Sequence, residues 1–165
     1  MWDCIRFLVL DVDGTLTDGK IYMAANGELF KSFDIKDGYG IANLLPQKGI
    51  EPVVITGRKS KIVTKRCAEL GIKYVFQNEQ NKLECLNRFI VTRNSECTGN
   101  FSLQNVAYVG DDENDLECMH AVKTAGGLCA CPADAVDSVK MICDYVSSRS
   151  GGCGAVREMI EYLLK

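Results

Sequence analysis

Four short apolar runs, separated by segments of helical pattern, do most to constrain how this 165-residue chain can fold. They read RFLVLDV at 6–12, EPVVIT at 51–56, KYVFQ at 73–77 and NVAYVG at 105–110, with shorter candidates at 128–131 and 143–146. Near-continuous apolar runs are typical of strands buried on both faces of a parallel sheet. Between them, apolar residues recur at helical spacing, as in Ile62, Val63, Cys67 and Leu70. This alternation predicts an α/β fold, a parallel sheet flanked by helices.

One segment interrupts the alternation. Residues 20–35 (KIYMAANGELFKSFDI) place an Asn26-Gly27 turn between two strand-like runs, which predicts a protruding β-hairpin. A helix is expected from about Asp37 to near Pro46, because proline disrupts a helix interior. The chain shows no repeat, low-complexity tract or linker, and its length suits about one domain. We therefore expect a single domain over residues 1–165.

Charge and composition argue against several classes of protein. Lys and Arg number 19 against 22 Asp and Glu, without the basic surplus typical of nucleic-acid binders. With no apolar run of about 18 residues and no signal-peptide pattern, we expect no membrane partner and a cytoplasmic location. Nine cysteines, an odd number without a CxxC pair, are expected to be reduced and to act mainly as small apolar residues. The one histidine, His120, is expected on a helix surface, which removes most Ser–His and Cys–His mechanisms.

Two acidic clusters follow predicted strands. Asp11-Val-Asp13-Gly14-Thr15 closes the first, where carboxylates are costly unless they are paired or bind a metal. A helix cap or turn is the alternative interpretation. Residues 110–115 (GDDEND) follow another predicted strand, and their negatively charged side chains repel one another unless a cation is near. Carboxylate oxygens suit Mg²⁺, whereas the alternative is an acidic helix start favoured by the helix dipole.

Two further features lie after predicted strands. Thr56-Gly57-Arg58 opens a helix, where a hydroxyl and free N–H groups form an anion site, although an ordinary N-cap threonine is the alternative. Lys82 begins the next helix, where a solvated side chain is the alternative. A parallel sheet aligns the carboxyl ends of its strands, so the six candidate side chains are expected to converge: Asp11, Asp13, Thr56, Lys82, Asp111 and Asp115. Carboxylates, a hydroxyl, a lysine and Mg²⁺ are a set suited to phosphoryl transfer.

The order DxDGT, apolar-Thr-Gly, Lys and GDDxxD resembles the haloacid dehalogenase superfamily of phosphotransferases from Arg6 onward. The resemblance implies a Rossmann-like fold with Asp11 as nucleophile and Asp13 as general acid and then base. It implies that substrate is bound by Thr56, Gly57, Arg58 and Lys82. It also implies Mg²⁺ held by Asp11, the Asp13 carbonyl and Asp111, with Asp112 and Asp115 in support. A carboxylate nucleophile is already ionised at neutral pH and needs no histidine.

The spacing of the motifs leaves no room for a cap domain. Only the hairpin and one helix separate the first motif from Thr56, and only one helix and one strand separate Thr56 from Lys82. The chain therefore resembles the capless branch of the superfamily. In the capless sugar-acid phosphatases the hairpins of four subunits form a central barrel and a neighbour covers each site, which implies a homotetramer here.

Within that branch the chain is most similar to the phosphatases of 3-deoxy-D-manno-octulosonate (KDO) 8-phosphate, which act in lipopolysaccharide biosynthesis. The similarity is carried by residues 10–19, 36–41, 55–60, 106–112 and 151–158, and Arg58 resembles the octulosonate branch. Three positions depart from the pattern. Cys153 replaces a usual Arg, Asn78 a usual Gly, and Pro46 lies where a helix normally continues.

Two alternatives remain open. One is a phosphatase of ketodeoxynononate or N-acylneuraminate 9-phosphate, associated with an acylneuraminate cytidylyltransferase, because Cys153 puts the sugar specificity in doubt. The other is a non-catalytic tetramerising domain that retains the fold, against which the complete catalytic set argues. Lys36 and Asp37 are weighed both as substrate contacts and as an ordinary helix start.

Overall fold

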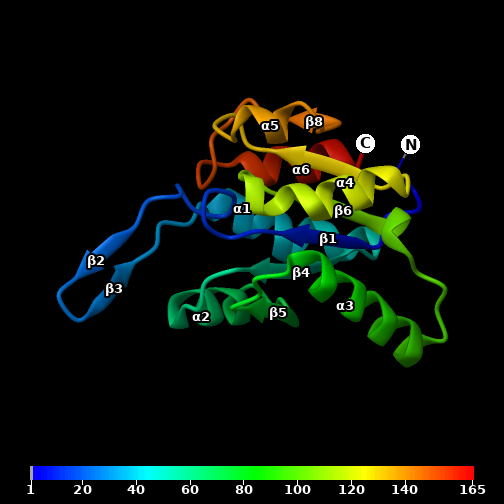
Figure 1. Ribbon diagram of the computed structural model, residues 1–165, viewed down its shortest axis with the longest axis horizontal. Helices are drawn as coiled ribbons and strands as arrows, with labels where there is room; N and C mark the ends of the chain where they lie inside the picture. Colours follow the sequence, from blue (N-terminus) through cyan, green and yellow to red (C-terminus); the bar gives the residue numbers. More distant parts are fainter. Residues whose placement is uncertain (1) are drawn as a thin grey trace.

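A parallel sheet forms the centre of the molecule. The computed structural model describes residues 2–165, and within them six strands pair in the order β5-β4-β1-β6-β7-β8. Each neighbouring pair is parallel. The strands are β1 (Phe7–Leu10), β4 (Glu51–Thr56), β5 (Tyr74–Gln77), β6 (Val106–Val109), β7 (Leu128–Cys131) and β8 (Tyr145–Val146). The predicted α/β fold is confirmed, and β1 lies at its centre between β4 and β6 (Figure 1).

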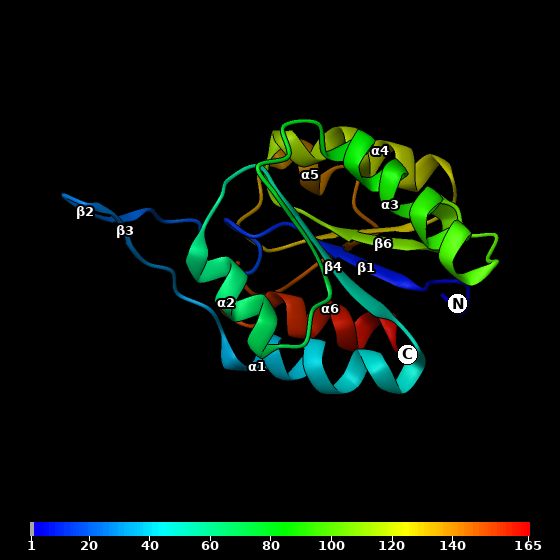
Figure 2. The same cartoon turned by 90° about the horizontal axis from the view of Figure 1, so that it is seen from below.

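Helices cover both faces of the sheet. Figure 2 shows α1 (Ile35–Tyr39), α2 (Lys61–Glu69) and α6 (Ala155–Leu163) on one side, and α3 (Lys82–Cys97), α4 (Leu116–Thr124) and α5 (Asp137–Lys140) on the other. Short 3₁₀ turns, η3 (Leu103–Asn105) and η4 (Glu113–Asp115), precede β6 and α4. Along β1, Leu8 and Leu10 pack into one core cluster and Phe7 and Val9 into the other. Burial on both faces is the reason that the strand sequences are continuously apolar.

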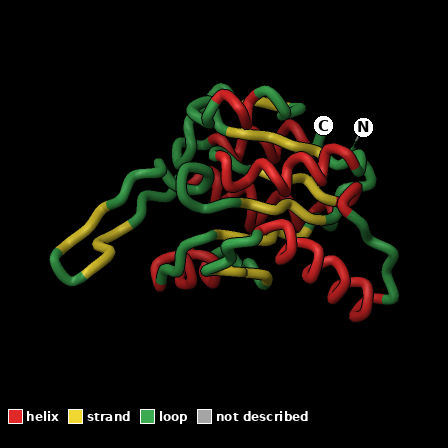
Figure 3. Tube along the Cα trace, viewed as in Figure 1, coloured by secondary structure: helices red, strands yellow, loops and turns green. Residues whose placement is uncertain are grey.

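The predicted hairpin is present and stands away from the sheet (Figure 3). Strands β2 (Tyr22–Ala24) and β3 (Gly27–Phe30) pair antiparallel, with Ala24 opposite Gly27. The turn residues are therefore Ala25 and Asn26, one position before the predicted Asn26-Gly27 turn. Gly27 is the first residue of β3 and has a φ of 125° that few other residues adopt. The ring of Phe30 stacks on that of Tyr22, 4.2 Å away, while Met23 and Leu29 are exposed.

The helix expected from about Asp37 to near Pro46 is present, although it changes form along its length and continues two residues beyond the proline. The helical path begins at Ile35, widens into a π-helical segment, η1 (Gly40–Leu44), and tightens into a 3₁₀ turn, η2 (Leu45–Lys48). Leu45 donates its N–H to the carbonyl of Gly40, five residues back. Pro46 then lies in the first turn of the 3₁₀ segment, where its missing N–H is not needed. The path ends at Gly49, which has a φ of 66°.

The cysteines and the histidine play no visible part in a site. All nine cysteines are free thiols, and Cys67, Cys85, Cys118, Cys129 and Cys131 are buried among apolar side chains. His120 is exposed on α4, as expected. Within residues 2–165 there is no helix with the length and apolar character needed to cross a membrane.

Candidate active site

The carboxyl ends of the central strands bring the predicted residues together. Asp11 follows β1, Thr56 is the last residue of β4, and Asp111 comes two residues after β6. Leu10 is level with Val54 of β4 and with Val109 of β6, so the three polar segments emerge side by side. Lys82 reaches the same place from the first turn of α3. Asp11, Thr56 and Lys82 are almost completely buried, each about 4% exposed or less.

Lys82 connects two of these segments. Its Nζ donates to Oδ1 of Asp11 at 2.7 Å and to Oδ1 of Asp115 at 2.8 Å. Burial alone would lower the pKa of Lys82, but the two carboxylates raise it above its usual value. The alternative of a solvated lysine is therefore excluded. Lys82 is a fixed positive charge beside Asp11.

Asp115 is fully occupied by protein donors. Besides Lys82, its carboxylate accepts the hydroxyl of Tyr108 at 2.8 Å and the backbone N–H of Asp111 at 3.1 Å. A Cβ at Gly110 would lie 2.4 Å from the Asp115 carboxyl carbon, so only glycine fits there. Asp115 thus holds Lys82 and the turn that carries Asp111.

Three carboxylates meet at this point without enough positive charge. One oxygen each of Asp11, Asp111 and Asp115 lies within 4.8 Å of the others. Burial, followed by repulsion from its neighbours, raises the pKa of Asp11 to about 7 and that of Asp111 to about 8. A divalent cation would relieve this repulsion, and the oxygen donors are of the hard type that Mg²⁺ prefers. Because Asp115 already accepts three protein donors, Asp11 and Asp111 are the carboxylates that fit a bound ion.

The loop after β1 is closely fitted to Asp111. The Thr15 hydroxyl donates to Oδ1 of Asp111 at 3.0 Å. Gly14 has a φ of 91°, and a Cβ there would lie 2.0 Å from Oδ2 of Asp111. Glycine in the DxDGT motif therefore lets the Asp111 carboxylate approach the backbone.

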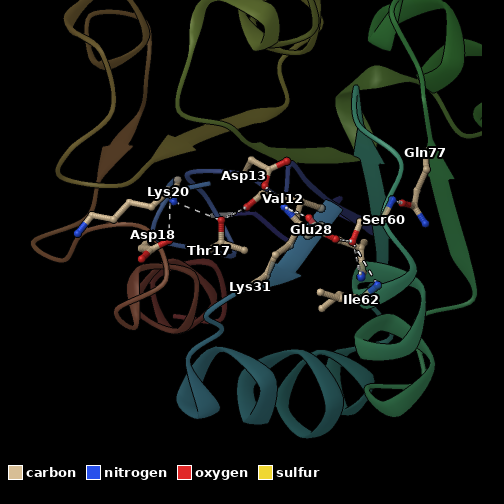
Figure 4. Close-up of polar contacts among 12 residues, drawn as sticks. Val12, Asp13, Thr17, Asp18, Lys20, Glu28, Lys31, Ser60, Ile62 and Gln77 are labelled. Atoms are coloured by element: carbon tan, nitrogen blue, oxygen red, sulfur yellow. Dashed lines mark hydrogen bonds and ion pairs between the residues drawn. The ribbon is translucent and has the colours of Figure 1, made fainter. Parts of the chain in front are cut away.

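Asp13 lies at the more open side of the site. Its side chain is 20% exposed, and it forms an ion pair with Lys31, which follows β3 of the hairpin (Figure 4). Sequence reasoning did not single out Lys31, because one lysine at the end of a hairpin strand is most simply explained as a solvated charge. A charged residue next to the apolar Leu29-Phe30 pair was the only available signal.

Three other predicted residues lie at the margin of the site. Asp112 is exposed, and its carboxylate accepts the N–H of Glu113 at 2.8 Å rather than contacting Lys82. Arg58 is exposed in the loop between β4 and α2. The expectation that Thr56-Gly57-Arg58 opens a helix is wrong, because α2 begins at Lys61 and its N-cap is Ser60. The carbonyl of Gly57 accepts the side-chain amide of Gln80 at 3.1 Å, which links that loop to the segment preceding Lys82.

The C-terminal loop packs directly on the loop after β1. Gly152 donates its N–H to the carbonyl of Thr15 at 3.2 Å, and a Cβ at Gly151 would lie 1.8 Å from the carbonyl oxygen of Gly14. Cys153, at the next position, is exposed. Asn78 has a φ of 62° and thus supplies the left-handed backbone that a glycine would supply there.

Asp37 joins two helices. It is 2% exposed, and its Oδ1 accepts the backbone N–H of Arg157 in α6 at 2.7 Å. Burial raises the pKa of Asp37 to about 6. These contacts favour the structural interpretation of Asp37 over a contact with substrate. Lys36, beside it, is exposed.

Known proteins share this arrangement over nearly the whole chain. No model of a known protein family matches the sequence. A 3-deoxy-D-manno-octulosonate 8-phosphate phosphatase of Escherichia coli is 45% identical over 164 residues, covering 97% of this chain and 79% of that protein. The chain belongs to the 3-deoxy-D-manno-octulosonate 8-phosphate phosphatase family. The enzyme of that name from Yersinia pestis is 38% identical over 160 residues, covering 97% of this chain and 80% of that protein.

Solved structures agree with membership of this family. The cobalt-bound enzyme of Haemophilus influenzae superposes with a TM-score of 0.88 at 37% identity, covering 99% of this chain and 89% of that one. The enzyme of Moraxella catarrhalis, in complex with magnesium ion, phosphate ion and KDO, superposes with a TM-score of 0.85 at 34% identity, covering 99% of this chain and 87% of that one. A putative haloacid dehalogenase superfamily hydrolase of Legionella pneumophila superposes with a TM-score of 0.88 at 32% identity, covering 99% of this chain and 84% of that one. The superfamily resemblance is confirmed, and the protein is a hydrolase of the phosphatase type.

Proposed function

We propose that this protein is a Mg²⁺-dependent phosphatase of 3-deoxy-D-manno-octulosonate 8-phosphate that acts through an aspartyl-phosphate on Asp11. The observation that carries the proposal is the buried pair of Asp11 and Lys82 beside Asp111, in a chain that is 45% identical to enzymes of that name. A carboxylate nucleophile must be shielded before it can approach a phosphate dianion, and this pair supplies part of the shielding.

The proposed reaction has two steps. An Asp11 carboxylate oxygen attacks phosphorus, the bond from phosphorus to the sugar oxygen breaks, and Asp13 gives its proton to that oxygen. Asp13 then takes a proton from water as the water oxygen attacks phosphorus, which releases phosphate and restores Asp11. General acid–base catalysis of this kind contributes roughly 10²- to 10⁴-fold to the rate. Asp13 suits the role because it is the more exposed of the two carboxylates.

The remaining residues would bind and stabilise. Asp11, Asp111 and the carbonyl of Asp13 would hold Mg²⁺, which when bound neutralises charge on the phosphoryl group. Lys82 would stabilise the same charge from the other side. Thr56, at the end of β4, and Gly57 and Arg58, in the loop that leads to α2, would bind the phosphoryl group and the adjoining part of the substrate.

Phosphate release from two substrates tests the proposal. With Mg²⁺ present, we expect the eight-carbon KDO 8-phosphate to have at least about tenfold higher kcat/KM than ketodeoxynononate 9-phosphate, a difference of about 1.4 kcal/mol. Arg58 supports this order, whereas Cys153 is the residue that argues against it. A preference for the nine-carbon substrate would move the assignment to nonulosonates. Absence of turnover with either would favour a non-catalytic domain.

We also propose that the hairpin assembles four copies of this chain. The support is an exposed apolar surface on an element that stands away from the sheet (Figure 1), made by Ile21, Met23, Leu29 and Phe30. Exposed apolar surface of this kind marks an interaction site, and an unpaired two-stranded hairpin is only marginally stable in water. Light scattering is expected to give the mass of four chains of 18.2 kDa. A double variant, Met23→Lys with Leu29→Lys, is expected to give monomers; a monomeric wild type would overturn the proposal.

A further inference from the structure

The hairpin contributes a buried cation to the site. Lys31 follows β3, and its Nζ lies between Oδ1 of Asp13 and Oε1 of Glu28, the latter at 3.1 Å. The Lys31 side chain is only 2% exposed. A buried ammonium is stable only when it is paired, so these two carboxylates fix the long side chain in one position. Figure 4 shows Lys31 and Glu28 lying between Asp13 and the start of α2.

Glu28 is itself held by the rigid end of a helix. Its Oε2 accepts the hydroxyl of Ser60 at 2.5 Å, and Ser60 is the N-cap of α2. The same Ser60 oxygen accepts the N–H groups of Ile62 and Val63 at 3.2 and 3.3 Å. Contacts therefore run without a break from α2, through Glu28 and Lys31, to Asp13. They join the loop that follows Thr56 to the loop that carries Asp13.

The two carboxylate oxygens of Asp13 have different surroundings. Lys31 occupies Oδ1, and in residues 2–165 no other hydrogen bond or ion pair to the Asp13 side chain is present. An ammonium group only donates. Oδ2 is therefore the oxygen of Asp13 that Lys31 leaves free.

We propose that Lys31 is a positioning residue for proton transfer by Asp13. It fixes the Asp13 carboxyl group and confines the transferable proton to Oδ2. This inference rests on the proposed function. As the bond between phosphorus and the sugar oxygen breaks, the proton passes from Oδ2 to that oxygen, and Lys31 keeps all of its own protons. The hairpin thus serves the chemistry of its own subunit.

Substrates with different leaving groups test this role. A sugar alkoxide needs a proton as it departs, whereas the weakly basic nitrophenolate does not. Lys31→Met is expected to lower kcat on KDO 8-phosphate by about 10- to 100-fold with little change in KM, which is part of the full general-acid contribution. The rate of the initial burst of nitrophenolate release from 4-nitrophenyl phosphate is expected to change less than about threefold. Lys31→Arg, which keeps a charged donor, is expected to recover part of the loss.

A matched variant controls for charge and for hairpin stability. Lys20 lies at the start of the same hairpin, is exposed and points away from Asp13 (Figure 4), so Lys20→Met is expected to leave both substrates within about twofold of wild type. Thermal unfolding shows whether each variant is folded. If Lys31→Met does not fold, Glu28→Gln neutralises the second partner of Lys31 and leaves both Lys31 and Asp13 unchanged. Glu28→Gln is expected to lower kcat less than Lys31→Met does, and again more on KDO 8-phosphate than on 4-nitrophenyl phosphate.

Several outcomes would overturn the inference. Equal losses on both substrates would make Lys31 a phosphate-binding or folding residue, and a rise in KM alone would make it a sugar contact. Failure of the proposed function is distinguishable: wild type would then hydrolyse 4-nitrophenyl phosphate but not KDO 8-phosphate. The comparison of leaving groups is in that case made with glycerol phosphate or another alkyl phosphate that wild type accepts. A wild type inactive on every phosphomonoester would overturn both.

Discussion

Asp11→Asn is expected to lower phosphate release by at least about 10³-fold, because the amide cannot serve as the nucleophile. The fold is expected to survive. Lys82 keeps its second partner, Asp115, at 2.8 Å, and the change removes one charge from a cluster whose burial and mutual repulsion raise the pKa of Asp11 to about 7. Phosphate release from KDO 8-phosphate at saturating Mg²⁺ measures the effect.

Two controls separate loss of chemistry from loss of structure. Without metal at pH 8, the Tm of Asp11→Asn should be no lower than the Tm of wild type. Asp112→Asn, a matched change at an exposed carboxylate of the neighbouring segment, should retain activity within about tenfold. Activity of Asp11→Asn within about tenfold of wild type would mean that water attacks phosphorus directly and that no aspartyl-phosphate forms.

Metal-free protein is expected to lose thermal stability as the pH rises from about 4 to about 8. The pKa values of Asp11 and Asp111 are raised from 3.8 to about 7 and about 8. The folded state therefore binds more protons than the unfolded state in this range, and stability falls as these groups ionise. Mg²⁺ binds the ionised carboxylates, so its stabilising effect should be small at pH 5 and large at pH 8.

The size of the effect follows from mass action. At a Mg²⁺ concentration about 100 times Kd, the gain in folding free energy is about 2.7 kcal/mol. For a chain of about 165 residues this corresponds to a rise in Tm of roughly 5–10 °C. Melting curves at pH 5 and pH 8, with Mg²⁺ or with chelator at matched ionic strength, measure it. Asp111→Asn should abolish most of the rise in Tm that Mg²⁺ causes. An equal rise in Tm at pH 5 and pH 8 would mean that Mg²⁺ binds at another site.

The sequence predicted the sheet well because burial on both faces leaves a clear signal. The run at 51–56 coincides with β4, and those at 6–12, 73–77 and 105–110 exceed β1, β5 and β6 by a few residues at most. The path of the chain around Pro46 was missed because a π-helical segment precedes the proline. Such a widening has no simple sequence pattern, and Leu45, whose N–H bonds to the carbonyl of Gly40, is buried in the core.

The site was predictable where residues follow strands and unpredictable where they come from elsewhere. Asp11, Thr56 and Asp111 could be brought together because parallel strands end at one edge. Lys82 was predicted to join them because its helix follows the run at 73–77, although a lysine at a helix start is usually solvated. Lys31 was missed because its position depends on how the hairpin folds back to Asp13, which no local pattern encodes.

The place of the first strand at the centre of the sheet has a consequence for synthesis on the ribosome. Strand β1 is made early but pairs with β4 and β6, and Gly14 is covered by Gly151. Asp11 and Gly151 are 140 positions apart, roughly 7–28 s of translation at about 5–20 residues per second. During that interval the nascent chain carries Asp11 as an ordinary hydrated carboxylate, with neither Lys82 nor Asp111 in place at first. The site can therefore be complete only after the C-terminal loop that contains Gly151 has been made and packs on Gly14.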